Sequence, residues 1–139
     1  MKVFTLFILV ALVAGTWALH KCTVMNAIKR GNVIGIKGYT LGDYMCLVHY
    51  ASYYDHTLNR SPSEYGIFQV NSYWWCDDGY TSGRKNLCRT SCYGLLDTDL
   101  SDDVRCLKRI VRDPNGLGAW SVWTKYCKGR NLNSYTTGC

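Results

Sequence analysis

The sequence predicts a small α+β domain in which helices surround a short antiparallel sheet and disulfides hold the two parts together. The chain has 139 residues and eight cysteines, an even number that can pair completely. Segments with apolar residues at helical spacing lie on both sides of one short β-favouring run. A chain of this length allows one domain, since domains commonly contain about 100–200 residues.

The first 18 residues are typical of a secretory signal peptide. Lys2 supplies the positive charge, residues 3–13 are almost wholly apolar, and the small residue Ala18 offers a cleavage point. The apolar run is too short to span a bilayer, which needs about 20 residues. We therefore expect residues 1–18 to be removed and residues 19–139 to form one secreted, extracellular domain without a membrane span.

Two helices are expected in the first half of this domain. Thr23–Arg30 has apolar residues at helical spacing, and Gly31 ends the segment. Thr40 can cap a second helix. Its apolar positions are Leu41, Tyr44, Met45, Val48 and Ala51.

The pattern then changes from helical to β-favouring. Turn-forming residues at 59–63 precede the run Tyr65–Val70, which predicts a strand of a small sheet, and a loop rich in Gly, Ser and Cys follows. Ser101 is expected to cap a third helix with two aspartates in its first turn. Residues 114–116 end that helix, and a short aromatic helix is expected from Ala119 to about Tyr126.

The cysteines indicate disulfides rather than a zinc site. An even count in a short secreted chain is typical of a disulfide framework formed in an oxidising compartment. The sequence has no CxxC pair, and its histidines are only His20, His49 and His56. Spacing alone leaves about 105 pairings of eight cysteines open.

The charge and the aromatic content bear on partners. The net charge is +6, one less without Lys2, and a basic secreted protein is drawn to anionic bacterial surfaces, although solubility explains the surplus equally well. The chain also has eleven tyrosines and five tryptophans, which supply core volume and stacking faces. We expect a monomer, with no nucleic-acid partner.

Four motifs and the cysteine spacing resemble the c-type lysozyme and α-lactalbumin family. The motifs are Gly-Tyr-Thr-Leu-Gly at 38–42, Tyr-Gly-Ile-Phe-Gln-Val-Asn-Ser at 65–72, Trp-Trp-Cys at 74–76 and Asn-Leu-Cys at 86–88. The resemblance covers essentially the whole mature chain and implies a lysozyme fold with a helical and a small β subdomain. It also implies the pairs Cys22–Cys139, Cys46–Cys127, Cys76–Cys92 and Cys88–Cys106.

The resemblance also implies that the catalytic pair is degenerate. The family's acid lies five residues after the second helix's cysteine, which here is Ala51, and the second carboxylate position holds Glu64 where the family's enzymes have aspartate. Retaining glycoside hydrolysis needs two carboxyl groups about 5–5.5 Å apart. His49 and Asp55 lie at other angles or farther along the helix, so we expect neither to replace the acid.

The sugar-binding and metal positions of the family are matched. The positions that imply sugar contact are Gln69, Asn71, Trp74, Trp75, Asp113, Ala119 and Trp120, although the tryptophans could instead cover the disulfide loop or fill the core. The resemblance implies a structural Ca²⁺ bound by carboxylates of Asp97, Asp102 and Asp103 and by the carbonyls of Gly94 and Asp99. Alternatively, Asp102 and Asp103 only complement the helix dipole.

We therefore expect a secreted pseudoenzyme that binds N-acetylglucosamine oligomers or bacterial cell-wall polysaccharide, peptidoglycan or chitin, in innate immunity. Two alternatives stay open. One is a weak muramidase that uses Glu64 and water, and the other is a cationic, membrane-active antibacterial protein. Asn59 begins a glycosylation sequon, but the Pro62 that follows it disfavours its use.

Overall fold

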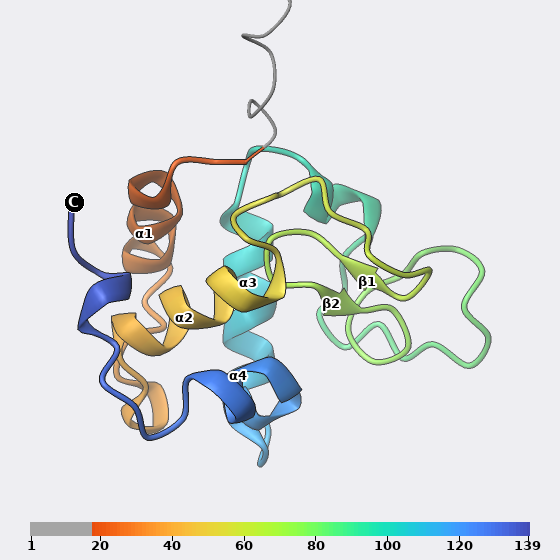
Figure 1. Ribbon diagram of the computed structural model, residues 1–139. Helices are drawn as coiled ribbons and strands as arrows, with labels where there is room; N and C mark the ends of the chain where they lie inside the picture. Colours follow the sequence, from red (N-terminus) through yellow and green to blue (C-terminus); the bar gives the residue numbers. More distant parts are fainter. Residues whose placement is uncertain (1–17) are drawn as a thin grey trace, which may run out of the picture.

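Four α-helices and a two-stranded antiparallel sheet form the fold of residues 18–139, which are the residues that the computed structural model describes. The expected α+β fold class is confirmed. Figure 1 shows α1 towards one end of the molecule and the β hairpin towards the other, with α3 between them. The elements are α1 Lys21–Arg30, η2 Ile36–Gly38, α2 Leu41–Ala51, β1 Glu64–Tyr65, β2 Val70–Asn71, η3 Tyr93–Leu96, α3 Ser101–Val111, η4 Gly116–Ala119, α4 Ser121–Tyr126 and η5 Asn133–Tyr135.

The predicted signal peptide, residues 1–18, lies outside the described residues apart from Ala18. Ala18 forms an isolated antiparallel bridge with Asp55, and the amide of Leu19 donates to the carbonyl of Tyr54 at 2.8 Å. None of the helices within residues 18–139 combines the length and the apolar character needed to cross a membrane.

Helix α2 is the central helix of the core. Its side chains are buried on almost every side, and the helix packs against both α1 and α4. The predicted cap is present: the Thr40 hydroxyl accepts from the amide of Asp43 at 3.2 Å, while the Asp43 carboxylate accepts from the amide of Thr40 at 2.8 Å. This reciprocal pair fixes where α2 begins, and the helix ends at Ala51.

Helix α1 begins two residues before the predicted Thr23. His20 is its N-cap, and the Nδ1 atom of His20 accepts from the amide of Cys22 at 3.1 Å. Gly31 ends the helix as expected and also permits close packing, because a Cβ at Gly31 would lie 2.0 Å from the Val104 Cγ1 atom of α3.

The predicted strand Tyr65–Val70 is wrong in its middle, because only its two end residues lie in strands. Tyr65 pairs with Val70 across the hairpin, and residues 66–69 form the turn between β1 and β2. Gly66 has a φ of +80°, and its carbonyl accepts from the amide of Gln69 at 3.0 Å. The apolar run is thus a hairpin tip that buries Ile67 and Phe68 in the core.

The predicted cap of the third helix is also wrong. Ser101 is the first residue of α3 and Leu100 is its N-cap, which has no side-chain cap. The Asp99 carboxylate takes that role, since it accepts from the amide and the hydroxyl of Ser101 at 3.0 and 2.7 Å. The aromatic helix begins at Ser121 rather than Ala119, because Ala119 belongs to η4.

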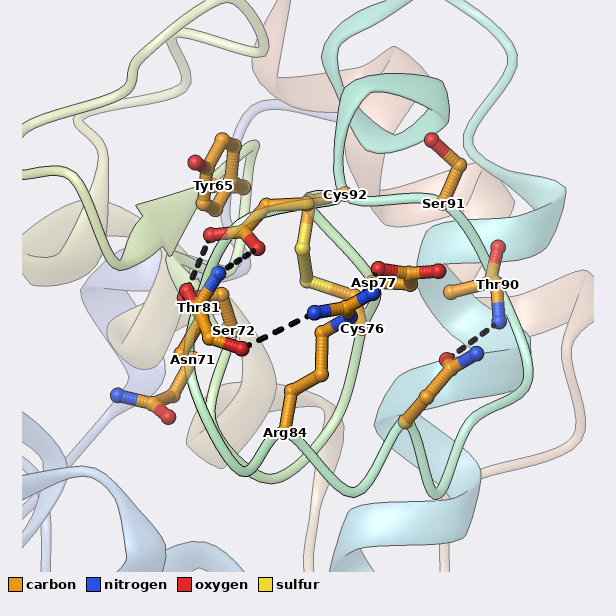
Figure 2. Close-up of a disulfide and its surroundings, with 12 residues drawn as sticks. Tyr65, Asn71, Ser72, Cys76, Asp77, Thr81, Arg84, Thr90, Ser91 and Cys92 are labelled. Atoms are coloured by element: carbon orange, nitrogen blue, oxygen red, sulfur yellow. Dashed lines mark hydrogen bonds and ion pairs between the residues drawn. A yellow bond between two sulfur atoms is a disulfide. The ribbon is translucent and has the colours of Figure 1, made fainter.

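Four disulfides cross-link the helices and the loops, and no cysteine is free. They join Cys22 to Cys139, Cys46 to Cys127, Cys76 to Cys92 and Cys88 to Cys106, which are the pairs that the resemblance implies. Figure 2 shows the Cys76–Cys92 disulfide with Ser72, Thr81 and Arg84 around it. This bridge closes the long loop beside the sheet, which has little regular structure of its own.

Candidate functional site

Two adjoining hollows form the candidate cleft between the sheet and the residues that follow α3. The first has a volume of about 220 Å³ and the second of about 540 Å³, and both are lined by Asn71 and Ala119. The two hollows together bring to one surface all seven positions predicted to contact sugar. In the first lie Gln69, Asn71, Ala119 and Trp120, and in the second Asn71, Trp74, Trp75, Asp113 and Ala119.

Ala51 and Glu64 meet in the first hollow. Ala51 is the last residue of α2 and lines the hollow while being 2% exposed, and Glu64 enters it from β1. The Glu64 carboxylate accepts from the Ser61 hydroxyl at 3.2 Å. Among the described residues that line this hollow, Glu64 is the one carboxylic acid.

Arg60 is a site residue that the sequence did not reveal. It lines the same hollow, and its Nη2 atom donates to the Ala51 carbonyl at 2.7 Å. In the sequence it is one arginine among turn-forming residues, with no pattern that separates it from a solvated side chain. Only the folding of residues 59–64 back onto the end of α2 brings it into the cleft.

Trp74, Trp75 and Asp113 form the open side of the second hollow. Trp74 is 49% exposed, and Trp75 is partly buried with the Arg109 guanidinium 5.7 Å from its ring centre. The same guanidinium donates to the Asp113 carboxylate at 2.6 Å. Arg109 therefore fixes both an aromatic ring and a hydrogen-bonding carboxylate on this side of the cleft.

Gln69 and Trp120 form the floor rather than free binding groups. The Gln69 side-chain amide donates to the carbonyls of Leu58 and Gly66, both at 2.8 Å. The Trp120 indole donates to the Phe68 carbonyl at 2.7 Å, and its side chain is 9% exposed. Both residues hold the hairpin tip against the helices, so they shape the cleft more than they can contact a ligand.

His49 and Asp55 do not line the cleft. The His49 ring lies within 4.7–6.3 Å of four tyrosine rings, those of Tyr50, Tyr53, Tyr54 and Tyr135. Burial lowers the pKa of His49, which disfavours its protonated form. The Asp55 carboxylate accepts from the amide and the hydroxyl of Thr57. Neither residue is a lining residue of the two hollows that hold Ala51 and Glu64.

Three aspartates meet at the start of α3. One carboxylate oxygen from each of Asp97, Asp102 and Asp103 lies within 4.8 Å of the others. Asp103 is fully buried, and neither of its carboxylate oxygens has a hydrogen-bond partner. Burial, followed by the neighbouring Asp102, raises the pKa of Asp103 to about 9. Such an arrangement is unfavourable without a cation.

The family model for C-type lysozyme and alpha-lactalbumin matches residues 17–139. The chain belongs to the C-type lysozyme/alpha-lactalbumin family. Lysozyme C of Bufo gargarizans andrewsi is 44% identical over 125 residues, which cover 86% of each chain. Lysozyme C of Dromaius novaehollandiae is 41% identical over 145 residues, with 100% of this chain and 99% of the relative covered. Sperm acrosome-associated protein 5 of Homo sapiens is 42% identical over 142 residues, with 99% and 88% covered.

The aspartate cluster of this lysozyme-family chain resembles the calcium site of some family members. The donor set fits that ion, because Ca²⁺ takes oxygen ligands only and Asp103 offers two buried oxygens without partners. Gly94 adjoins the cluster, since a Cβ there would lie 3.6 Å from the Asp102 Oδ2 atom. The Asp99 carboxylate is instead bonded to Ser101.

Proposed function

We propose that this chain is a secreted, non-catalytic member of the lysozyme family that binds N-acetylglucosamine-containing polysaccharide, peptidoglycan or chitin, in innate immunity. The observation that carries the proposal is Ala51 in the wall of the first hollow, beside positions that match sugar contacts of the family. The seven positions that match sugar contacts line two adjoining hollows. The position that matches the acid carries a methyl group.

The chemistry of glycoside hydrolysis explains why this difference matters. A carboxylic acid must protonate the departing sugar oxygen while a second carboxylate stabilises or attacks the anomeric carbon. A general acid typically contributes about 10²–10⁴-fold to the rate. Glu64 can supply one carboxylate, but the first hollow offers no second one among its described lining residues. We therefore infer that a bound polysaccharide is not cleaved.

Binding does not need the missing group. An exposed indole such as Trp74 can stack on the apolar face of a pyranose ring. The side-chain Oδ1 atom of Asn71 accepts from the backbone amides of Tyr73 and Trp74, while the side-chain NH₂ group is left for a ligand hydroxyl or N-acetyl group. Asp113, held by Arg109, adds a carboxylate acceptor at the other end.

We also propose that Asp97, Asp102 and Asp103 hold a structural Ca²⁺ with the carbonyls of Gly94 and Asp99. When bound, the ion neutralises the three carboxylates and links the loop before α3 to the helix start. The support is that both carboxylate oxygens of Asp103 are buried without a hydrogen-bond partner. In this proposal the ion stabilises the scaffold beside the cleft and takes no part in sugar recognition.

Two assays on the mature protein test the proposed function. We expect no clearing of a bacterial suspension between pH 4 and 9, and we expect tryptophan fluorescence to change on titration with chitotetraose. Trp74→Ala should weaken that binding. Lysis with a bell-shaped pH profile would support the weak-muramidase alternative. Membrane leakage without any sugar binding would support the membrane-active alternative.

A further inference from the structure

Another hollow lies between α1 and the start of α3 and is separate from the sugar cleft. It has a volume of about 320 Å³ and shares no lining residue with the two hollows of the cleft. We propose that this α1–α3 hollow binds a free α-amino acid with an aliphatic side chain. The proposal goes beyond the proposed sugar binding, and it is carried by the apolar floor, the two opposite charges and the size of the hollow.

A close contact between the two helices forms one end of the hollow. Gly31, just after α1, lies so near the Val104 side chain of α3 that a Cβ at Gly31 would collide with it. Ala27 and Thr23 also line the hollow, about one and two turns before Gly31, because residues four apart are neighbours on a helix surface. The hollow therefore begins at this contact and extends along α1.

The floor of the hollow is aliphatic. Ala27, Leu100 and Val104 line it, and each of them is at most 9% exposed. This apolar surface favours the aliphatic part of a ligand over water. The described residues that line the hollow include no aromatic ring on which a sugar could stack. The floor thus points to an aliphatic side chain rather than to a second sugar.

Two charges of opposite sign lie at the rim of the hollow. Arg30 contributes the positive charge from α1, and Asp99 contributes the negative charge from the loop before α3. The ion pairs found within residues 18–139 involve neither residue, so the two charges do not neutralise each other. A ligand with both groups can therefore bridge the rim, with its carboxylate at Arg30 and its ammonium group at Asp99.

The hydrogen bonds of Asp99 leave one of its oxygens for the ligand. The amide and the hydroxyl of Ser101 both donate to the Oδ1 atom, at 3.0 and 2.7 Å. These bonds hold the carboxylate in place, which lowers the entropy that a ligand contact costs. The Oδ2 atom takes neither bond and can accept from an ammonium group, while the planar fork of Arg30 matches the two oxygens of a carboxylate. An α-amino acid carries both groups on one carbon.

The size of the hollow limits the ligand to one small molecule. Ligand pockets commonly have volumes of about 300–1,000 Å³, and the α1–α3 hollow lies at the lower end of that range. A single amino acid is a ligand of this size.

A purely structural role of the two charges makes a different prediction. Arg30 then only complements the C-terminal end of α1, and Asp99 only fixes the start of α3 through Ser101. In that case no amino acid binds, and removing either charge changes the stability of the protein alone.

The test titrates the mature protein, in excess calcium, with four ligands and follows binding by calorimetry or NMR. L-Leucine carries the carboxylate, the ammonium group and the aliphatic side chain. Leucinamide lacks the carboxylate, N-acetyl-leucine lacks the ammonium group, and glycine lacks the aliphatic side chain. We expect L-leucine to bind with a Kd of about 1 mM or lower, and each of the other three to bind about tenfold more weakly.

Two variants assign each charged group of the ligand to one residue. Arg30→Gln should weaken L-leucine binding about tenfold and leave leucinamide binding unchanged, because leucinamide has no carboxylate. Asp99→Asn keeps the Oδ1 acceptor for Ser101 and should weaken L-leucine binding while leaving N-acetyl-leucine binding unchanged.

Two further variants locate the site. Ala27→Leu fills the floor of the hollow and should abolish the binding of L-leucine. Lys29→Gln is the matched control for Arg30→Gln, because it removes the same charge from an exposed neighbour that does not line the hollow. It should leave L-leucine binding intact.

Three results would overturn the proposal. One is that L-leucine does not bind the unmodified protein, which would assign the two charges to the helix ends. Another is equal affinity for L-leucine, leucinamide and N-acetyl-leucine. The third is L-leucine binding that survives both Arg30→Gln and Asp99→Asn. If a variant lowers the melting temperature, the four ligands on the unmodified protein still decide. Chitotetraose titrated into the same samples tests the sugar-binding proposal separately.

Discussion

In the proposed function, the side chain at position 51 decides whether the cleft can hydrolyse a bound sugar. Alanine offers no proton at this position, and the carbonyl of the same residue accepts a hydrogen bond from the Arg60 guanidinium at 2.7 Å. A glutamate returned to this position would therefore meet a positive charge. An opposite charge within about 4–6 Å lowers the pKa of a carboxyl group by about 1–3 units, which favours the ionised form. A general acid must be protonated at the working pH.

The first prediction concerns the variant Ala51→Glu with Glu64→Asp, which restores both family carboxylates. We expect lysis of a bacterial suspension to appear, but weakly and with an acidic optimum, because Arg60 holds the restored acid in its ionised form at neutral pH. Adding Arg60→Gln should raise the rate and move the optimum towards neutral pH. The measurement is the pH profile of clearing for the double and the triple variant.

The matched control combines Glu64→Asp with Arg60→Gln and keeps Ala51. It should stay inactive. If the double and triple variants have the same pH profile, Arg60 has no influence on the restored acid. If neither clears the suspension while both still bind chitotetraose, the cleft lacks more than the two carboxylates.

For single residues, the sequence predicted which side chains line the cleft better than what each side chain does there. Trp74 is exposed and Asn71 is half-buried, and both line the second hollow. Gln69 and Trp120 also line the cleft. However, the side-chain amide of Gln69 and the indole N–H of Trp120 already donate to backbone carbonyls. Hydrogen-bond partners depend on the tertiary fold, so no motif could separate these two roles. Arg60 was missed for the same reason.

At the scale of elements, helices were predicted well and the hairpin poorly. The cap of α2 depends on neighbouring residues, Thr40 and Asp43, so the local sequence contains the information. The run Tyr65–Val70 has strand propensity throughout, but Gly66 turns the chain where a Cβ would lie 2.3 Å from the Leu95 carbonyl. That contact joins residues about thirty positions apart, and propensity does not contain it.

The second prediction concerns calcium at the start of α3. An ion that binds only the folded state stabilises it by about 2.7 kcal/mol at 100 times Kd. Excess calcium should therefore raise the melting temperature by several degrees over excess chelator. Asp102→Ala should abolish the difference, while Asp99→Ala should keep it because the Asp99 side chain is bonded to Ser101. Equal melting temperatures with calcium and chelator would mean that the aspartates do not hold the ion.

The third prediction is the pH dependence of the ion-free protein. Burial raises the pKa of Asp103 from the ordinary 3.8 to about 9, so the folded state binds this proton more tightly than the unfolded state does. The stabilisation is then complete below about pH 4 and is lost as pH rises towards 9. In chelator we expect the unfolding free energy to fall over this window.

Calcium should remove the dependence, because the bound ion favours the ionised carboxylate. Calorimetric or denaturant unfolding at pH 5 and pH 8, with calcium and with chelator, measures both trends. The Asp103→Asn variant is the control, since it has no proton to lose there. A chelated protein as stable at pH 8 as at pH 5 would contradict the assignment.

The fourth prediction concerns Asp78, which lies in the loop that the Cys76–Cys92 disulfide closes. Burial would raise the pKa of Asp78, but hydrogen bonds from Thr81 and Tyr80 outweigh burial and lower it to about 2. The ionised carboxylate therefore stabilises the fold above about pH 4, and the contribution is lost as pH falls towards 2.

Asp78→Asn should lower the unfolding free energy at pH 7 by about 2 kcal/mol, as expected for hydrogen bonds to a charged group. The adjacent Asp77→Asn is the matched control: its ion pair with Arg84 is exposed and should contribute less than about 1 kcal/mol. Denaturant unfolding of both variants gives the comparison. Equal losses for the two variants would mean that the hydrogen bonds of Asp78 do not stabilise this loop.

At the scale of the whole molecule, the four disulfides differ in how solvent reaches them. Three of the bridges have at least one almost fully buried cysteine, and in two of these, Cys46–Cys127 and Cys76–Cys92, both cysteines are fully buried. Cys22–Cys139 is the exception, because Cys22 is partly exposed and Cys139 is exposed at the chain end. Thiol exchange needs direct access of the attacking thiolate to a sulfur atom.

The fifth prediction follows from that difference. Under mild reductant without denaturant, we expect Cys22–Cys139 to open first and to give a species with two free thiols and three remaining bridges. Because that bridge closes a loop with a sequence separation of 117, its loss should cost about 2–5 kcal/mol yet leave the cleft between the sheet and the residues that follow α3 in place. Chitotetraose binding should therefore survive.

Alkylation and mass spectrometry before reduction should find no free thiol, and after mild reduction should find label only on Cys22 and Cys139. Label on Cys76 or Cys92 at the same stage would mean that the loop beside the sheet opens more readily than its burial indicates.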